Sequence, residues 1–283
     1  MRYQEQGAWH DGSLRFLGAR IGKLLAVVFN FTADTFTVAE LEARKLHHDS
    51  TELLTRAVQP AIWLLIFGEV LSQVRAIPTG QISYIDFLTP GILAQSVLFI
   101  AIFYGIAVIW ERDLGILHKL LVSPAPRSAL VLGKALSAGE RGLSQAAIIY
   151  LLAFFLGVRI NWTPVAVAGV LLVVIMGSAL FSTFSLIVAC LVRTRERFMG
   201  VGQLLTMPLF FASNAIYPIS IMPGWLQAIS QVNPLTYEVD ALRVLMVLGG
   251  SSLYGVVVDL AVLLATTALL VMIAGRLYPK VIV

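Results

Sequence analysis

Cysteine, charge and nucleotide-binding motifs are all scarce in this sequence of 283 residues. A single cysteine, Cys190, excludes an intramolecular disulfide and a cysteine cluster around a metal ion. No Gly-x-x-x-x-Gly-Lys-[Ser/Thr] loop is present, because neither Gly-Lys pair is followed by serine or threonine, so we expect no ATP hydrolysis by this chain alone. No nucleophile–base pair stands out either. The sequence therefore predicts no catalytic, cofactor-binding or metal-binding residue and no enzyme activity.

Charged residues make up only 13% of the chain, against about 25% in soluble domains, and 58% of the residues are hydrophobic. Several apolar runs approach the roughly 20 residues that a transmembrane helix needs. This excess of apolar residues faces lipid, which predicts an all-α, polytopic integral membrane protein. Six transmembrane helices are expected, at residues 57–74, 87–110, 142–158, within 163–192, 198–217 and 253–274.

The N-terminal segment, residues 1–56, is expected to be separate from the six-span transmembrane domain, residues 57–283. It has no cleavage site after a charged start and an apolar core, so we expect no signal peptide. Thr37-Val-Ala-Glu40 fits a capping box that opens a helix. That helix is too polar for the bilayer core, and we interpret it as an interfacial helix beside lipid headgroups. A solvated cytoplasmic helix is the alternative.

Lysine and arginine are distributed unevenly between the two sides of the predicted membrane domain. With the N-terminus inside, the cytoplasmic segments hold all of the 20 Lys and Arg residues except Arg75, Arg159 and Arg243. This asymmetry follows the positive-inside rule and places both termini in the cytoplasm. It also accounts for the net charge of +4 without a nucleic-acid partner.

A polar island, residues 111–134, separates the second and third predicted spans. Its leucines recur at helical spacing while its charged residues lie off that stripe, which predicts a short amphipathic helix ended by Pro124 and Pro126. Such a helix can lie on a membrane surface and dock into a groove on another protein. The stretch resembles the cytoplasmic coupling helix of the permease subunits of type-2 ABC transporters. An ordinary basic loop at the inner face is the alternative.

This resemblance implies that the coupling helix sits against a separate ATPase subunit. The residues expected to contact that subunit are Glu111, Arg112, Gly115, Leu117, His118, Lys119, Leu120 and Leu121. His118 departs from the family pattern, in which an acidic residue often follows the loop glycine. The resemblance further implies two ATPase subunits, which carry ATP and Mg, and a second permease subunit, identical or related. The resemblance also includes Phe67-Gly68-Glu69-Val70 and Phe87-Leu-Thr-Pro-Gly-Ile92. It therefore covers almost all of the sequence after about residue 57.

The stretch between the fifth and sixth predicted spans is rich in proline. Pro218 and Pro223 are expected to break the fifth span, and Pro223 and Pro234 can each open a short helix. Such short, polar helices do not cross a bilayer, so we expect external re-entrant helices that cap the outer mouth. They are similar to the Asn-Pro-Leu-Thr-Tyr segment of type-2 ABC permeases; a plain aromatic interfacial anchor is the alternative. Asp240 and Arg243 are spaced to pair. The candidate gate residues are Pro218, Pro223, Trp225, Asn233, Pro234, Tyr237, Asp240 and Arg243.

Side chains within the predicted spans are candidate pathway positions: Gln95, Ser96, Gln145, Gln203, Phe210 and Asn214. Hydrogen bonding between helices, or simple packing for Phe210, is the alternative. The resemblance implies an ATP-driven exporter in the inner (cytoplasmic) membrane. The lack of a rich polar lining favours a hydrophobic or amphipathic small molecule, such as a drug-like compound, an antibiotic or a lipid. The alternatives are a polysaccharide or glycolipid exporter and, more remotely, an ion-coupled secondary transporter, which would usually show ionisable residues near the membrane midplane.

Overall fold

The computed structural model describes residues 58–74, 77–80, 82–115, 126–192 and 194–278, together with Thr32, Ala33, Thr35, Thr37 and Glu40. Within these residues every regular element is a helix and no strand forms. The predicted all-α class is therefore confirmed for the part of the chain that is described. Most of the predicted interfacial segment lies outside these residues.

The predicted capping box at Thr37 is wrong. Thr32, Ala33 and Thr35 are already helical, so the helix is under way before Thr37 is reached. The Thr37 hydroxyl donates a hydrogen bond to the carbonyl of Ala33 at 2.8 Å. Threonine forms this bond to the preceding turn inside a helix, not at its first residue.

The helices follow one another with short links. The first apolar helix spans Val58–Gln73 and contains a π-helical stretch. In chain order the elements are η1 (Trp63–Gly68), α3 (Glu69–Val74), α4 (Tyr84–Asp113), α6 (Arg127–Phe155), α7 (Pro164–Leu191), α8 (Arg195–Phe211), η2 (Ile219–Ile221), α9 (Gly224–Val232), α10 (Pro234–Met246) and α11 (Val256–Leu277).

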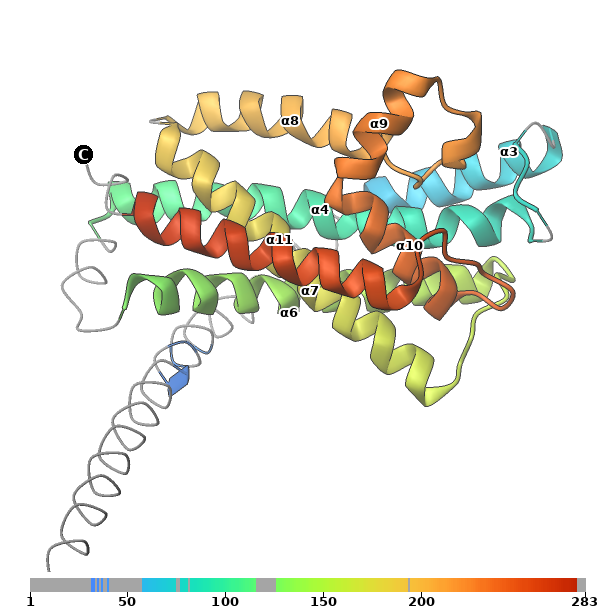
Figure 1. The fold of residues 1–283 in the computed structure, drawn as a ribbon, viewed down its shortest axis with the longest axis horizontal. Helices are drawn as coiled ribbons and strands as arrows, with labels where there is room; N and C mark the ends of the chain where they lie inside the picture. Colours follow the sequence, from blue (N-terminus) through green and yellow to red (C-terminus); the bar gives the residue numbers. More distant parts are fainter. Residues whose placement is uncertain are drawn as a thin grey trace, which may run out of the picture.

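Helix α7 lies at the centre of the bundle and packs against α4, α6, α10 and α11, while the first helix and α8 pack along α4 (Figure 1). Small residues allow these close approaches. A Cβ atom on Gly105 of α4 would collide with Ser185 of α7, and one on Gly142 of α6 would collide with Ser178 of α7. Small residues at helix contacts are typical of packing in membranes, where lipid supplies no hydrophobic drive between helices.

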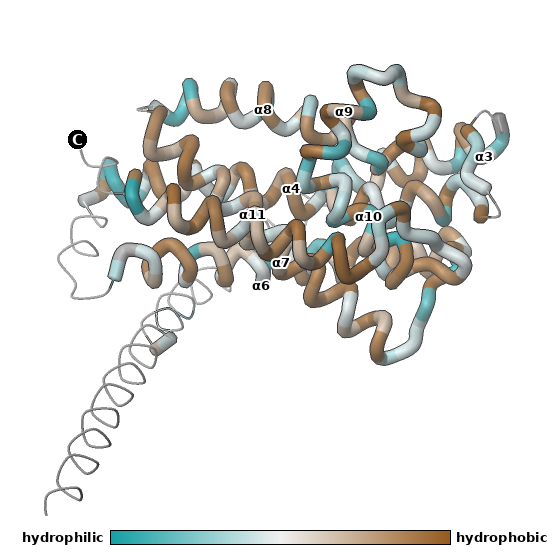
Figure 2. The backbone as a smooth tube through the Cα atoms, viewed as in Figure 1, coloured by the Kyte–Doolittle hydropathy of each residue, from teal (hydrophilic) through white to brown (hydrophobic). Residues whose placement is uncertain are grey.

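Hydrophobic residues run along α7 and α11 (Figure 2). Among the described residues, α4, α7 and α11 are long and apolar enough to cross a membrane, by length and composition. A helix also lies at each of the other three predicted positions, but the first helix is shorter, α8 has 17 residues, and α6 contains Lys134, Glu140 and Arg141. Helix α6 begins at Arg127, directly after the prolines predicted to end the preceding helix, and it continues into the predicted third span. The buried contacts of Lys134, described below, explain why the helix continues through a charged stretch.

The fifth predicted span was placed too far along the chain, because α8 ends at Phe211 rather than near residue 217. The Asn233 side-chain amide donates to the carbonyls of Leu209 and Ala212 at 2.7 and 3.1 Å. It thereby satisfies carbonyl groups that the last turn of a helix leaves without partners. Two short helices, α9 and α10, follow as predicted in place of a continuous span, and Pro234 occupies the first turn of α10.

Candidate functional site

The predicted coupling segment begins at the end of the bundle where α4 ends and α6 and α8 begin, which we call the coupling end (Figure 1). Glu111 of α4 and Lys134 of α6 form an ion pair there, with 2.6 Å between Oε2 and Nζ. Both side chains are buried, and the Lys134 ammonium lies 6.0 Å from the centroid of the Tyr104 ring. Because a buried charge without a partner is costly, this pair holds together the two helices that flank the coupling segment.

Beside this buried pair, the surface of the coupling end carries a second set of charges. Asp113 accepts hydrogen bonds from Arg112 at 3.0 Å and from Arg195 of α8 at 2.9 Å. The Arg195 guanidinium also lies 3.5 Å from the centroid of the Trp110 ring. These partly exposed contacts connect the end of α4 to the start of α8.

The predicted ATPase contacts fall partly outside the described residues. Glu111 faces the interior of the bundle, whereas Arg112 lies nearer the surface. Gly115 adopts a φ of +70°, a conformation that favours glycine, and a Cβ atom there would meet nothing within 4 Å. Its contact with an ATPase subunit therefore stays a prediction. The same holds for the residues that lie outside the described ranges, which are Leu117, His118, Lys119, Leu120 and Leu121.

A pocket of about 350 Å³, which we call the side pocket, lies between the first helix and α4. The candidate pathway residues Gln95 and Ser96 line it, together with Phe99 and Phe103. The Ser96 hydroxyl is used within α4, donating to the carbonyl of Ile92 at 2.8 Å. Gln95 is buried, and its Oε1 atom has no hydrogen-bond partner among the described residues. The pocket wall is therefore apolar and aromatic over Pro60, Phe99, Ile100 and Phe103, with polar side chains at Gln59, Gln95 and Ser96.

The other candidate pathway residues do not join this pocket. Gln145 is buried in α6, and Gln203 is exposed on α8. Phe210 is buried and packs edge-on against the Trp63 ring, with 6.0 Å between centroids, so it joins α8 to the first helix. Asn214 lies beyond the end of α8, at the opposite end of the bundle.

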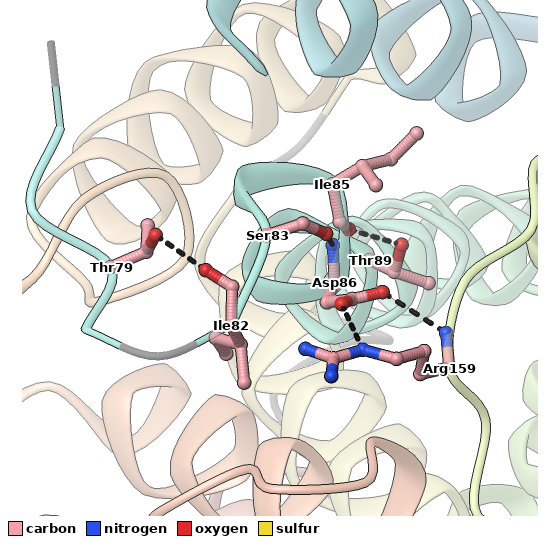
Figure 3. Close-up of polar contacts among 7 residues, drawn as sticks. All are labelled: Thr79, Ile82, Ser83, Ile85, Asp86, Thr89 and Arg159. Carbon is pink, nitrogen blue, oxygen red and sulfur yellow. Dashed lines mark hydrogen bonds and ion pairs between the residues drawn. The ribbon is translucent and has the colours of Figure 1, made fainter. Parts of the chain in front are cut away.

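We call that opposite end, where α4 and α11 begin, the pocket end. Asp86 in the first turn of α4 accepts hydrogen bonds from the Arg159 backbone N–H at 3.0 Å and from Arg159 Nε at 3.1 Å (Figure 3). The Ser83 hydroxyl caps α4 by accepting from Asp86 N–H at 3.2 Å. The carbonyl of Arg159 accepts from Leu248 N–H at 2.8 Å. Arg159 therefore joins the start of α4, the α6–α7 link and the segment after α10.

Asp240 of α10 is buried at this end, and several donors surround its carboxylate. Its Oδ2 atom accepts from the Ser252 hydroxyl at 2.7 Å and from the backbone N–H groups of Leu253 and Tyr254 at 2.6 and 3.2 Å. Its Oδ1 atom accepts from Asn214 Nδ2 at 3.3 Å. These hydrogen bonds tie α10 to the link after α8 and to the segment before α11.

Arg243, three residues further along α10, is buried near Asp240 without contacting it directly. It donates to the carbonyl of Asn214 at 2.6 Å, and its guanidinium lies 3.9 Å from the centroid of the Phe87 ring. Among the described residues it forms no ion pair, so the spacing-based pairing with Asp240 does not occur. Burial lowers the pKa of Arg243 to about 10, with Asp240 acting in the opposite direction. Arg243 therefore remains charged at neutral pH.

A pocket of about 650 Å³, which we call the end pocket, opens beside these residues. Its walls come from the link before α4, the link after α8 and the segment between α10 and α11. Asp240 and Arg243 both line it, as do Asn214 and Phe87. Two charges of opposite sign therefore share one pocket without neutralising each other by direct contact.

Glu238 is a buried carboxylate that sequence analysis missed. It is fully buried in α10, and neither carboxylate oxygen has a hydrogen-bond partner among the described residues. A Cβ atom on Gly177 of α7 would collide with it. Burial raises the pKa of Glu238 well above 4.5. Position 238 lies on the same helical face as the buried residues Leu235 and Leu242. This spacing could have predicted that Glu238 is buried.

The other candidate gate residues shape the short helices. Asn233 Oδ1 caps α10 by accepting from Leu235 N–H at 3.0 Å, and the Tyr237 hydroxyl donates to the carbonyl of Gln231 at 2.6 Å. Trp225 is 67% exposed on α9, so it is available to contact lipid or another chain. Each of the three prolines stands at a helix start or immediately before one: Pro218, Pro223 and Pro234.

Three described helices of spanning length and apolar composition indicate a multi-pass membrane protein. The described residues contain no group of three or more His, Cys, Asp or Glu that could hold a metal ion. A family model for the ABC-2 type transporter matches residues 34–247, which is well over half of the sequence. The chain therefore belongs to the ABC-2 type transporter family. Family members are transport subunits rather than enzymes themselves, and membership implies an ABC ATPase partner and a dimeric permease.

Curated relatives share this family. The chain is 29% identical over 221 residues to the putative transport permease ycf38 of Cyanophora paradoxa, covering 77% of this chain and 75% of that protein. It is 27% identical over 199 residues to the daunorubicin resistance ABC transporter permease protein DrrB1 of Streptomyces coeruleorubidus, covering 70% of each. It is 24% identical over 213 residues to the inner membrane transport permease YadH of Escherichia coli (strain K12), covering 71% of this chain and 79% of that protein. The predicted resemblance to type-2 ABC permeases is confirmed.

Proposed function

We propose that this chain is the permease subunit of an ATP-driven exporter that moves a hydrophobic or amphipathic small molecule out of the cytoplasm. It acts in the inner (cytoplasmic) membrane as one of two permease subunits, beside two ATPase subunits that bind ATP and Mg. Six membrane crossings with both termini in the cytoplasm complete the proposal, supported by the concentration of Lys and Arg in the predicted cytoplasmic segments.

The side pocket is the observation that carries the substrate class. Phe99, Ile100 and Phe103 give it an apolar and aromatic wall, and Gln95 supplies an acceptor without a partner among the described residues. Pockets of this kind suit apolar ligands that are oriented by a few polar groups. A sugar chain would need many more hydrogen-bonding groups. The drug resistance in the name of DrrB1 agrees with a drug-like substrate.

The ion pair at the coupling end supports the mechanism. Glu111 and Lys134 hold α4 and α6 together on either side of the segment that would contact the ATPase. Force applied to this segment during ATP-driven closure therefore reaches both helices at once. The contact between Asp113 and Arg195 transmits the same force to α8. Movement of these helices would then open the pathway towards the outside.

The coupling role is tested by Leu120→Asp, with Leu120→Met as the matched control. Burying a carboxylate without a partner at an interface costs several kcal/mol, so the aspartate variant is expected to lose its ATPase subunit. Co-purification, substrate-stimulated ATP hydrolysis and transport in proteoliposomes should all fall in this variant and persist in the control. If the aspartate variant binds its ATPase and transports normally, the segment is only a connector. Transport driven by an ion gradient without ATP would instead support a secondary carrier.

The side pocket is tested by Gln95→Leu, with Gln203→Leu on the exposed surface of α8 as the matched control. Loss of the Gln95 acceptor is expected to reduce transport of an amphipathic amine such as daunorubicin about tenfold, because a hydrogen bond to a charged donor is lost. The control removes the same amide from a position outside the pocket. Equal transport by both variants would show that this pocket does not bind the transported molecule.

A further inference from the structure

The end pocket contains two opposite charges that are not satisfied by each other. Asp240 is surrounded by hydrogen-bond donors from Asn214, Ser252 and the backbone after it, and Arg243 lies against Phe87. Within the described residues, no ion pair joins Arg243 to any carboxylate. Both charges line the same 650 Å³ pocket. A ligand in this pocket therefore meets a positive and a negative group together.

Two buried polar atoms beside these charges lack hydrogen bonds. Arg243 Nε, a donor, and Asn214 Oδ1, an acceptor, have no partner among the described residues. Buried polar groups in native proteins are rarely left without partners, so such atoms mark places where a water or a ligand belongs. A ligand that satisfies both atoms must offer an acceptor to Arg243 Nε and a donor to Asn214 Oδ1.

The walls of the pocket suit a small polar group attached to an apolar body. Phe87, Pro218 and Ile219 supply apolar surface, while Ser251 supplies a hydroxyl-bearing residue at an exposed position. The loop before α4 is fixed by a hydrogen bond from the Thr79 hydroxyl to the carbonyl of Ile82 at 2.8 Å (Figure 3). The rim is therefore partly ordered without a ligand.

We propose that the end pocket binds a zwitterionic group, in which an ammonium and an anionic oxygen acid are joined by a short linker. The anionic oxygen binds Arg243, and the ammonium donates to Asn214 Oδ1 beside Asp240. The phosphoethanolamine headgroup of a phospholipid has this chemistry, and so does a free phosphoethanolamine in solution. Such a site would exist whether or not the chain exports a drug-like molecule.

Ligands of a single charge fit this pocket less well. A simple anion would approach Arg243 but would be repelled by Asp240, which lines the same pocket. A simple cation would be repelled by Arg243. A zwitterion places each charge beside its opposite, which is the electrostatic complementarity that gives specificity.

Short-chain phospholipids test this site on the full-length chain, purified with its partner subunits. Dihexanoyl phosphatidylethanolamine is compared by titration calorimetry with the phosphatidylcholine and phosphatidylglycerol of the same chain length. We expect the ethanolamine lipid to bind about tenfold more tightly than either, because choline has no N–H donor and glycerol has no positive charge. Free phosphoethanolamine is the fourth ligand. If it binds as well as the lipid, the site serves a soluble zwitterion; if only the lipid binds, the site serves a membrane headgroup.

Two variants assign this selectivity to the end pocket. Arg243→Met removes the positive charge and should abolish the preference for ethanolamine. Because Arg243 is buried and its loss could disturb folding, Ser251→Trp fills the mouth from an exposed position, with Ser251→Ala as its control. Tight ethanolamine binding that is lost in Ser251→Trp and kept in Ser251→Ala supports the proposal. Equal binding of the three lipids, no binding of any zwitterion, or selectivity that survives Ser251→Trp overturns it.

Discussion

Buried charges are paired directly at one end of the bundle and are not paired with each other at the opposite end. At the coupling end, Glu111 and Lys134 neutralise each other across 2.6 Å and join two helices. At the pocket end, Asp240 and Arg243 share a pocket without direct contact, and Glu238 is buried with neither carboxylate oxygen bonded to a described residue. A paired charge acts as a structural link. Arg243 and Glu238 keep side-chain atoms without partners among the described residues, and such groups retain the capacity to bind a ligand or a proton.

This difference fits the expected division of work in an ABC-2 type permease. A coupling end must transmit force without yielding, which favours a buried pair whose separation is costly. A pocket end that admits ligands must keep polar groups available, at some cost in stability. Breaking the buried pair should therefore cost more stability than other substitutions, which the following variants examine.

The largest effect is expected from Lys134→Met. It removes the buried ion pair with Glu111, which should lower the free energy of unfolding by about 3–5 kcal/mol. Thermal unfolding in detergent, followed by tryptophan fluorescence, measures the loss. The double variant Lys134→Met with Glu111→Leu removes both charges and should recover most of the stability. If the double variant is as unstable as the single one, the side-chain shapes matter more than the pairing.

A smaller effect is expected from Gly177→Val, where the middle of α7 contacts α10. The new side chain would collide with the Glu238 carboxylate, and overpacking of this kind costs about 1–3 kcal/mol. In a Glu238→Ala background the added side chain has room, so the same substitution should cost less. A double-mutant cycle on unfolding midpoints measures the difference. Equal costs in both backgrounds would show that α7 and α10 adjust without using this contact.

The next effect is the contribution of Glu238 to the pH dependence of stability. Its pKa in the folded protein is raised by burial, whereas in the unfolded chain it is near 4.5. Between these two values the folded state binds more protons, so this contribution to stability is present below pH 4.5 and is lost as the pH rises through the raised pKa. The slope approaches about 1.4 kcal/mol per pH unit within that window. Glu238→Gln should remove it, measured as unfolding midpoint against pH; an unchanged slope would contradict the assignment.

The sequence predicted the helices well where the pattern is local. Apolar runs of spanning length identified α4, α7 and α11, because helix length and hydrophobicity are properties of one segment. The burial of Lys134 near the start of α6 was not predicted, because its partner Glu111 lies 23 residues earlier, on another helix. No local pattern contains that contact.

The same limit applies to the candidate site. Pro234 was correctly placed at a helix start, because proline geometry is a local signal. The contact between Asp86 and Arg159 spans 73 residues and depends on how three links meet. Glu238 could have been found from its place on the apolar face of α10. The two pockets could not, because each is lined by segments that are distant in the sequence.

The smallest effect is expected from Asp113→Asn, which tests whether burial, rather than position at the coupling end, makes a charge pair strong. The side chains of Asp113 and Arg195 are 38% and 34% exposed, so water screens their contact. Exposed pairs contribute below about 1 kcal/mol, and in 1 M salt, where the screening length is about 3 Å, this variant and the wild type should unfold at the same temperature. The loss of stability in Lys134→Met should persist in the same salt, because salt screens a buried ion pair far less. If Asp113→Asn still lowers the unfolding temperature in 1 M salt, the exposed pair also stabilises the fold. Burial alone would then not explain which charge pairs between helices are strong at this end.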